Sequence, residues 1–378
     1  MSPKIGYFSV NWENGMKISK DHFVQQDNAF NDKLKDVFAS FLNDRHFGLL
    51  PVDSNVGDSI KTVLKIDNHN FLKVNILQCR AISQGGARIE ILEEHILPEM
   101  EVDISRELEA SKKAESEMYY VLLSVDIFNG QPFGDLDSNE DPPRYPFTIP
   151  SYKINIISEK EVSKNGVHPY SFFIGKIDLS NENPSIDDDY IPPCMSVNSH
   201  RKLMEFSMSV EKFFSQLELN LVNIIRKINE KKQDSNLAKS VFDLSSNLLQ
   251  YTTNNHLKLK WEVPALPPIY LFEYIATLAR VIRNTIDTSS AANKEELLNY
   301  FTNWSELKQG DFEKLLVYCI NFEYRHFDIL VSMEQFSEFL QIISLLYDKL
   351  ESLAYIGKKK ETNIFVKEQK TKRSFLAD

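Results

Sequence analysis

The chain has 378 residues, of which 42% are hydrophobic and 26% are charged, and it contains 25 phenylalanines but 12 glycines. This composition predicts a folded protein of two or three domains with a large aromatic core, and it excludes a disordered chain. The formal net charge of −11 excludes a general affinity for nucleic acid, because an acidic chain repels a phosphate backbone.

The cysteines and the N-terminus indicate where the protein resides. Cys79, Cys194 and Cys319 are far apart and form no C-x-x-C pair, so neither a disulfide framework nor a zinc site is expected. The first residues, MSPKIGYFSV, lack the apolar core of a signal peptide, and no apolar run approaches the length of a membrane span. We therefore expect a cytoplasmic protein that does not insert into a membrane.

Residues 1–200 are expected to form a β-rich domain that includes an N-terminal segment at 1–45. Gly85 and Gly86 suit a hairpin turn, and a loop rich in Pro, Gly and Asp is expected at 129–150. Short strands at this spacing predict an antiparallel sandwich or barrel. The runs that predict strands are 62–83, 87–92, 118–128, 151–162 and 170–179.

The pattern changes after the acidic run at 187–189 and the Pro192–Pro193 pair, and residues 201–356 are expected to form a helical bundle or coiled coil. Helices are predicted at 203–232, 236–251, 268–282, 311–329 and 333–356. The fold class is therefore α+β, with an antiparallel β-sandwich or barrel-like part followed by helices.

The first long helix has apolar residues at heptad spacing. This row comprises Leu203, Val210, Phe214, Leu217, Leu221, Ile224 and Ile228. Either the other helices of the same chain or the same helix in sister copies can cover it, and the pattern alone favours the first option. Each buried Leu or Ile contributes roughly 1.5–3 kcal/mol in both arrangements, so energetics do not decide.

No residue pattern points to a catalytic, cofactor or metal site. Asp135, Asp137 and Asn139 match the start of a calcium loop, but Glu140 replaces its glycine and Pro146 its bidentate glutamate, so a solvated loop is expected. His22 has no second histidine at ligand spacing and is expected to be packed or hydrogen-bonded.

A nucleophile–base pair is not expected either. Cys319 and His326 would lie two turns apart on one helix, about 10 Å, which is too far for such a pair. The chain also lacks a G-x-S-x-G elbow, a Walker loop and a G-x-G-x-x-G motif. The residues alone therefore predict a non-catalytic building block that forms oligomers.

Four motifs, in order along the chain, resemble the TssK (ImpJ/VasE) family of type VI secretion baseplate subunits. The N-terminal motif comprises Trp12, Gly15, Met16, His22, Phe23, Gln25, Gln26 and Asp27. The others are PPRYPFTIP at 142–150, YIPPCMSVNSH at 190–200, and the pair formed by PPIYLFEYIATLARVI at 267–282 and YRHFDI at 324–329.

The resemblance implies a non-enzymatic adaptor with a β-rich shoulder, a helical neck and a head domain. It implies a homotrimer held by the neck, a shoulder that grips TssF/TssG-like wedge proteins, and a head that contacts the membrane complex. It therefore favours a contact between copies for the heptad row, and a cytoplasmic location at a baseplate docked on the inner membrane. No cofactor is implied.

The chain departs from the family after residue 356, where a short basic tail at 357–378 stands in place of a head. This tail is interpreted as solvated, with docking to an acidic partner, including the membrane complex, as the alternative. The N-terminal motif has two interpretations as well: Trp12, Met16 and Phe23 pack into the shoulder core around a turn at Gly15, or they contact a wedge protein. A general coiled-coil scaffold or fibre adaptor, and an enzyme with a cleft between sheet and helices, are the other functions considered.

Overall fold

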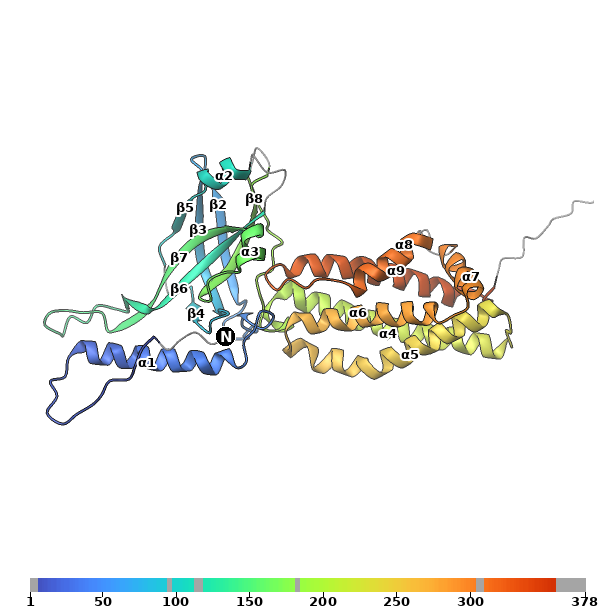
Figure 1. Cartoon of the computed structure of the whole chain (residues 1–378), viewed down its shortest axis with the longest axis horizontal. Helices are drawn as coiled ribbons and strands as arrows, with labels where there is room; N and C mark the ends of the chain where they lie inside the picture. The colour runs from blue at the N-terminus through green and yellow to red at the C-terminus, as the bar shows by residue number, and fades with distance from the viewer. Residues whose placement is uncertain (1–5, 94–96, 112–117, 181–183, 304–308, 358–378) are drawn as a thin grey trace, which may run out of the picture.

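The computed structural model describes residues 6–93, 97–111, 118–180, 184–303 and 309–357. Figure 1 shows an elongated molecule with a β-rich domain at one end and a bundle of long helices at the other. All strands of the described residues lie between Gly48 and Ile186, and the long bundle helices lie between Arg201 and Ser352. The expected α+β class, with antiparallel strands before the helices, is confirmed.

The first sheet is built around one long strand, β3, which pairs antiparallel with four shorter ones. Side chains of β3 alternate between buried and partly exposed positions, as expected for a sheet with one face on a core. Gly86 has φ +84° in the turn between β3 and β4, which confirms the predicted hairpin. The strands are β1 (Gly48–Leu49), β2 (Ile60–Ile66), β3 (Phe71–Ile82), β4 (Arg88–Ile91) and β5 (Met100–Asp103).

The second sheet has the order β7-β6-β8-β9, and the buried side chains of one of its faces share a core with the first sheet. Its strands are β6 (Met118–Phe133), β7 (Phe147–Ser158), β8 (Ser171–Asp178) and β9 (Ser185–Ile186). The predicted loop at 129–150 is shorter than expected, because β6 and β7 continue as a hairpin until Phe133 pairs with Phe147. This hairpin extends well beyond the sheet (Figure 1).

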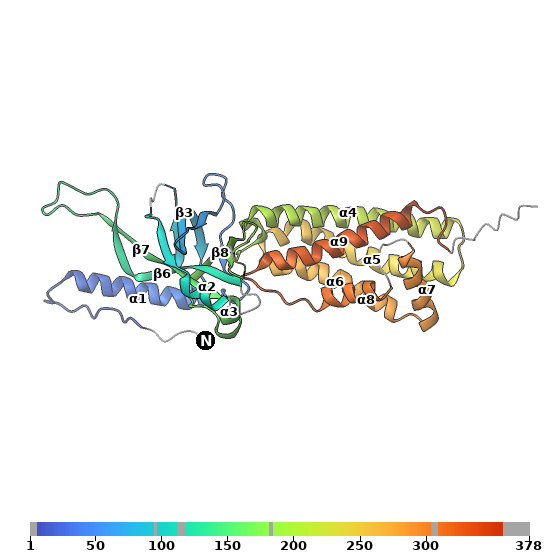
Figure 2. The ribbon, with the colours of Figure 1, turned by 90° about the horizontal axis from the view of Figure 1, so that it is seen from above.

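Three helices accompany the sheets: α1 (Lys20–Ala39), α2 (Ser105–Ser111) and α3 (Glu159–Asn165). Helix α1, in the N-terminal segment, was not among the predicted helices. It lies along the outside of the β-rich domain, on the side from which the β6–β7 hairpin projects (Figures 1 and 2).

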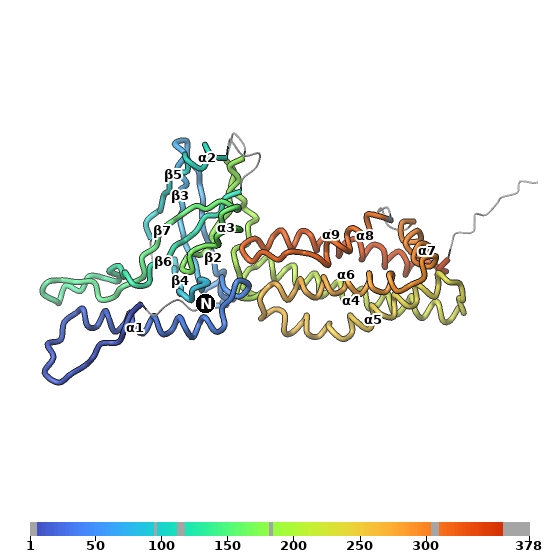
Figure 3. The backbone as a smooth tube through the Cα atoms, viewed as in Figure 1, coloured from blue at the N-terminus to red at the C-terminus, as the bar shows by residue number. Residues whose placement is uncertain are grey.

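The bundle follows an up-and-down path that the tube in Figure 3 makes visible. Its helices are α4 (Arg201–Glu230), α5 (Asn236–Trp261), α6 (Pro268–Asp287), α7 (Ala291–Thr302), α8 (Gln309–Ile320) and α9 (Ile329–Ser352). Helix α5 is capped by the Ser235 hydroxyl, which accepts from the Ala238 N–H at 3.1 Å, and α6 begins at Pro268, as expected for a proline at a first helical position. Helix α4 packs against α5 and α9.

The heptad row of α4 is buried inside the chain's own bundle. Each of its seven side chains is at most 4% exposed: Leu203, Val210, Phe214, Leu217, Leu221, Ile224 and Ile228. The interpretation that favoured a contact between copies is therefore wrong for this row, because a side chain that one chain already covers has no surface left for a second. Covering by helices of the same chain, the alternative favoured by the pattern alone, is what the structure shows.

The predicted helix at 311–329 is interrupted. Helix α8 ends at Ile320, and residues 321–328 leave the bundle before α9 begins at Ile329. Cys319 therefore lies on α8 and His326 in the following segment, so the prediction that they share one helix is wrong. The interruption is explained by contacts of Tyr324–Asp328 with the β-rich domain, which a helix through these residues would prevent.

By length and composition alone, helix α9 could cross a membrane. No apolar run of that length was expected from the sequence. In the structure one face of α9 packs in the bundle, where Phe336, Phe339, Ile343 and Leu346 are buried. Core helices of globular proteins also pass a test of length and composition, so we interpret α9 as a bundle helix.

The chain crosses once from the β-rich domain into the bundle, through residues 187–200. This connection is paired with β1: the Leu49 N–H donates to the Pro193 carbonyl at 2.8 Å, and the Met195 N–H donates to the Leu49 carbonyl at 2.9 Å. Gly48, with φ +124°, allows this approach, since a Cβ there would lie 2.1 Å from the Pro193 carbonyl oxygen.

Two leucines on α4 provide a test of the row. Leu217 is 2% exposed and Leu219 is 55% exposed. We expect Leu217→Ala to lower the free energy of unfolding by about 2–5 kcal/mol, because it opens a cavity, and Leu219→Ala to change it by less than about 0.5 kcal/mol. Denaturant unfolding measures both, and equal effects would contradict the assignment of the two faces.

Candidate interaction surface

An N-terminal arm, residues 6–18, runs back along α1 and is tied to it by hydrogen bonds. The Val10 N–H donates to Gln26 Oε1 at 3.1 Å, and Gln25 Nε2 donates to the Phe8 carbonyl at 3.2 Å. His22 Nδ1 accepts from the Ser19 N–H at 3.1 Å at the start of the helix, so His22 is hydrogen-bonded, as predicted. The motif glutamines thus hold the arm on the helix.

Asp32 and Lys35 form an ion pair within α1 that ties the helix to the N-terminal arm and to the β-rich domain. Asp32 binds Lys35 and also accepts from the Tyr7 N–H at 3.0 Å. The Lys35 ammonium lies 4.5 Å from the Phe128 ring centroid and 5.4 Å from that of Tyr170, which places a cation over two aromatic faces.

The pKa values of this pair follow from its surroundings. Burial acts to raise the pKa of Asp32, but the hydrogen bonds from Lys35, Tyr7 and Gly6 outweigh it, and the pKa is lowered. Burial acts to lower the pKa of Lys35, but Asp32 and Tyr170 outweigh it, and the pKa is raised. Both groups are therefore held in their charged forms at neutral pH.

The opposite face of α1 is apolar and faces solvent. Its residues follow one another at spacings of seven, four, three and four, which is the spacing of a coiled-coil face. We call them the α1 stripe: Phe23, Phe30, Leu34, Val37 and Phe41, each exposed by half or more of its surface. A helix normally buries such a face, so this one lacks its cover within the described residues.

The motif residues extend the α1 stripe. Trp12 is 48% exposed, and its ring centroid lies 6.1 Å from those of Phe23 and of His22. Gly15 has φ +84° with open space around it, as the predicted turn requires, Met16 is partly buried and Asp27 is exposed. Trp12 and Phe23 do not enter the shoulder core, so the core-packing interpretation of these two residues is wrong.

The β6–β7 hairpin adds further exposed apolar side chains near its tip, namely Leu136, Tyr145 and Phe147. Asp137 accepts from the Asn139 N–H at 2.9 Å, and Arg144 binds Glu140. The side chains of the loop that resembled a calcium site are therefore hydrogen-bonded within the loop. The hairpin and the N-terminal arm both project past the sheets, away from the bundle (Figures 1 and 2). Together with the α1 stripe they form what we call the N-terminal surface.

A second exposed row lies on α4, which runs along one edge of the bundle (Figure 2). It points away from the buried row and has alternating spacings of four and three. We call it the outer α4 row: Met208, Lys212, Ser215, Leu219, Val222 and Arg226. Met208, Leu219 and Val222 are 68%, 55% and 45% exposed, so this row also offers heptad spacing to a partner.

Polar contacts fix the rotation of α4 about its axis. Toward α5, Glu218 Oε2 lies 3.2 Å from His256 Nδ1. Toward α9, Asn220 Nδ2 donates to Asp348 Oδ1 at 2.6 Å, and Asn223 Nδ2 donates to Glu351 Oε1 at 3.3 Å. These contacts on both sides leave the outer α4 row as the face directed at solvent.

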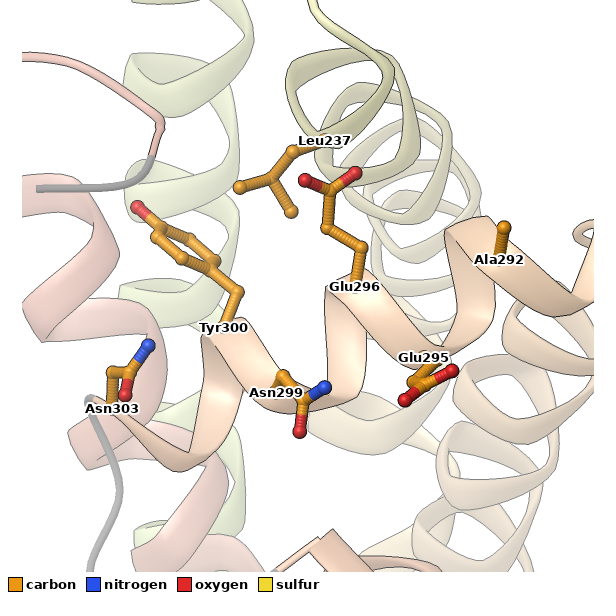
Figure 4. Close-up of a pocket in the computed structure, with 7 residues that line it drawn as sticks. All are labelled: Leu237, Ala292, Glu295, Glu296, Asn299, Tyr300 and Asn303. Atoms are coloured by element: carbon orange, nitrogen blue, oxygen red, sulfur yellow. The ribbon is translucent and has the colours of Figure 1, made fainter.

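The described residues hold no group of three or more His, Cys, Asp or Glu side chains that could bind a metal ion. A pocket of about 320 Å³ near the far end of the bundle is lined by residues including Glu295, Glu296, Asn299 and Tyr300 (Figure 4). It presents carboxylates and amides but neither a histidine nor a cysteine, so it lacks a nucleophile with an adjacent base.

The cysteines are buried and unreactive in this conformation. Burial raises the pKa of Cys79 and of Cys319 to about 12, and it raises that of Cys194 further. Burial also lowers the pKa of His326 to about 4, against a hydrogen bond with the Phe47 carbonyl that acts to raise it. The thiols are therefore protonated and His326 is neutral at physiological pH.

No family model matches the chain, and no curated protein matches it significantly in sequence. Solved structures that resemble it include structures of TssK. One is a crystal structure of TssK, 13% identical, with a TM-score of 0.49, covering 89% of this chain and 69% of that chain. Another is TssK from the type VI secretion system of EAEC in complex with nanobody nb18, 13% identical, with a TM-score of 0.46, covering 86% of this chain and 99% of that one. A third comes from a cryo-electron microscopy structure of the TssK-TssF-TssG baseplate subcomplex, 12% identical, with a TM-score of 0.45, covering 89% and 99%.

The anchor of α1 can be tested by hydrogen exchange. We expect Asp32→Asn to increase amide exchange over residues 6–39 while the bundle stays protected, because the arm and α1 lose a charged acceptor. Asp36→Asn, at an exposed site of the same helix, should leave exchange unchanged.

The same anchor has a defined pH dependence. Because the folded-state pKa of Asp32 is lowered, the anchor is fully present above the usual value of about 3.9 and is lost as the pH falls through the lowered pKa. Equal exchange in both variants at neutral pH would contradict the role of the pair.

Proposed function

We propose that this chain is a non-catalytic structural subunit of a type VI secretion baseplate, located on the cytoplasmic side of the inner membrane. Its N-terminal surface binds wedge proteins of the TssF/TssG kind, and its bundle holds it in a homotrimer. One observation carries the proposal: the motif that resembles the TssK family, Trp12 to Asp27, adjoins an apolar surface that the described residues leave exposed, and contributes Trp12 and Phe23 to it.

The N-terminal surface has the properties of a docking site for a protein. Its apolar side chains come from three segments of the chain, and one of these, α1, is tied to the arm by Asp32 and to the β-rich domain by Lys35. Covering the half-exposed α1 stripe contributes on the order of 5 kcal/mol before the costs of association. Exposed aromatic side chains of this kind are typical anchors of protein interfaces.

For the contact between copies, the outer α4 row replaces the row that the sequence favoured. It is exposed, it keeps the heptad spacing, and it places apolar residues between a lysine and an arginine. Lys212 and Arg226 limit its apolar area, which suits a reversible contact between folded chains. The number of copies, three, is taken from the resemblance.

The C-terminal end is assigned to the membrane complex as part of the same proposal. Residues 358–378, which make up nearly all of the basic tail, lie outside the described residues. A general scaffold or fibre adaptor would use the same two surfaces with other partners, so identifying the protein that binds the α1 stripe distinguishes the two functions.

Binding to wedge proteins is tested with purified TssF/TssG-like proteins. We expect Phe30→Asp/Leu34→Asp to weaken binding at least about tenfold, because two charges would enter an apolar contact. Leu257→Asp, at another exposed apolar site on a different helix, is the matched control and should bind normally. Wild-type chain that ignores the wedge proteins would refute this part of the proposal.

The oligomeric state is tested by light scattering. Wild-type chain, alone or with wedge proteins, should have three times the 43.8 kDa mass of one chain. Leu219→Asp/Val222→Asp should give folded monomers, since both side chains are exposed in the single chain and their replacement disturbs no core. A trimer that survives this change would exclude the outer α4 row, and a strictly monomeric wild type would exclude the trimer.

A further inference from the structure

The segment Tyr324–Asp328, which interrupts α8 and α9, inserts into the β-rich domain; we call it the junction segment. The Phe327 ring stacks on Phe173, with centroids 5.5 Å apart and planes at 19°. The Phe327 ring also packs edge-on against the Tyr120 ring, with centroids 5.4 Å apart. The backbone carbonyl of Phe327 accepts from the Tyr190 hydroxyl at 2.8 Å. A residue of the bundle thus completes a small aromatic core of the second sheet.

Asp328 occupies the N-cap position of α9, but its carboxylate does not cap that helix. Asp328 Oδ2 instead accepts from Lys176 Nζ at 2.7 Å and from the Tyr120 hydroxyl at 2.8 Å, across the junction. All three residues are buried, and burial together with the charge of Asp328 raises the pKa of Tyr120 far above its usual value. The N-terminal end of α9 adds a favourable field for the carboxylate.

His326 adds a neutral contact to the charged one. Its Nε2 lies 2.7 Å from the Phe47 carbonyl oxygen, and its Nδ1 lies 2.7 Å from the Tyr324 hydroxyl. A carbonyl can only accept, so Nε2 carries the proton and Nδ1 accepts from Tyr324. The junction segment therefore contacts both the second sheet and the start of β1.

We propose that the junction segment is a latch that fixes the orientation of the bundle relative to the β-rich domain, and that the Lys176–Asp328 pair makes its closure specific. The chain crosses between the two parts once, at residues 187–200, and the junction segment adds a second set of contacts that opposes rotation about that connection. A buried ion pair contributes little net stability, but an alternative orientation would leave two unpaired buried charges. The latch is therefore either fully closed or open to solvent.

The latch is independent of any partner and can be tested on the purified chain. Spin labels at Lys65→Cys in β2 and Asp243→Cys in α5 report the distance between the two parts. Labels at Asp243→Cys and Glu338→Cys report a distance within the bundle, and all three positions are exposed. Native Cys79, Cys194 and Cys319 are buried and should not react. Wild-type chain should give one narrow distribution for each pair of labels.

Breaking one side of the pair should open the latch. Asp328→Asn and Lys176→Met should each widen the Lys65–Asp243 distribution about twofold and leave the Asp243–Glu338 distribution unchanged. The double variant should be narrower than either single one, because no unpaired charge remains. Arg325→Ala breaks a solvent-exposed ion pair with Glu159 in the same segment and should change neither distribution.

Three results would overturn the latch: an unchanged width in folded single variants, widening of both distributions together, or a double variant as wide as the single ones. If Asp328→Asn or Lys176→Met fails to fold, Tyr120→Phe serves as the test instead. This variant keeps the ion pair and the aromatic ring and removes one hydrogen bond. It should widen the Lys65–Asp243 distribution by less than the charge variants do, and an unchanged width would count against the latch.

Discussion

The burial of the α4 row by α5 and α9 determines which surfaces this chain can offer to others. Once its seven apolar side chains are enclosed, the bundle is complete as a single-chain unit. Any assembly must then use faces that folding leaves exposed. The described residues have two such faces with helical spacing, the α1 stripe and the outer α4 row, and they lie on different parts of the molecule.

The two exposed faces differ in a way that suits different partners. The α1 stripe is apolar over its whole length and is joined by aromatic residues of the arm and the hairpin, so it resembles the centre of a stable interface. The outer α4 row combines three apolar side chains with Lys212, Ser215 and Arg226, so it resembles a contact between copies that also remain folded apart. A connector with one strong and one weaker face can be assembled in a fixed order.

Much of the fold follows from sequence periodicity, but the partners of each face do not. The spacing of Val210, Leu217 and Ile224 shows that a row is covered, and it is equally compatible with a neighbour from the same chain or from another. The α1 stripe could have been recognised by the same spacing, and a helix predicted there, but not its exposure. That exposure depends on Lys35, which holds the opposite face of α1 against Phe128 and Tyr170, far away in sequence.

Periodicity also suggested an unbroken helix through His326, whose partner Phe47 lies 279 positions earlier. The junction depends on equally distant contacts, because Lys176 and Asp328 are 152 positions apart and Tyr120 and Asp328 are 208. During translation, the residues of both sheets are therefore synthesised long before Asp328. Domains generally fold as units, the N-terminal one first during synthesis. The contacts of Lys176 and Tyr120 with Asp328 can therefore form only after nearly the whole bundle has been synthesised.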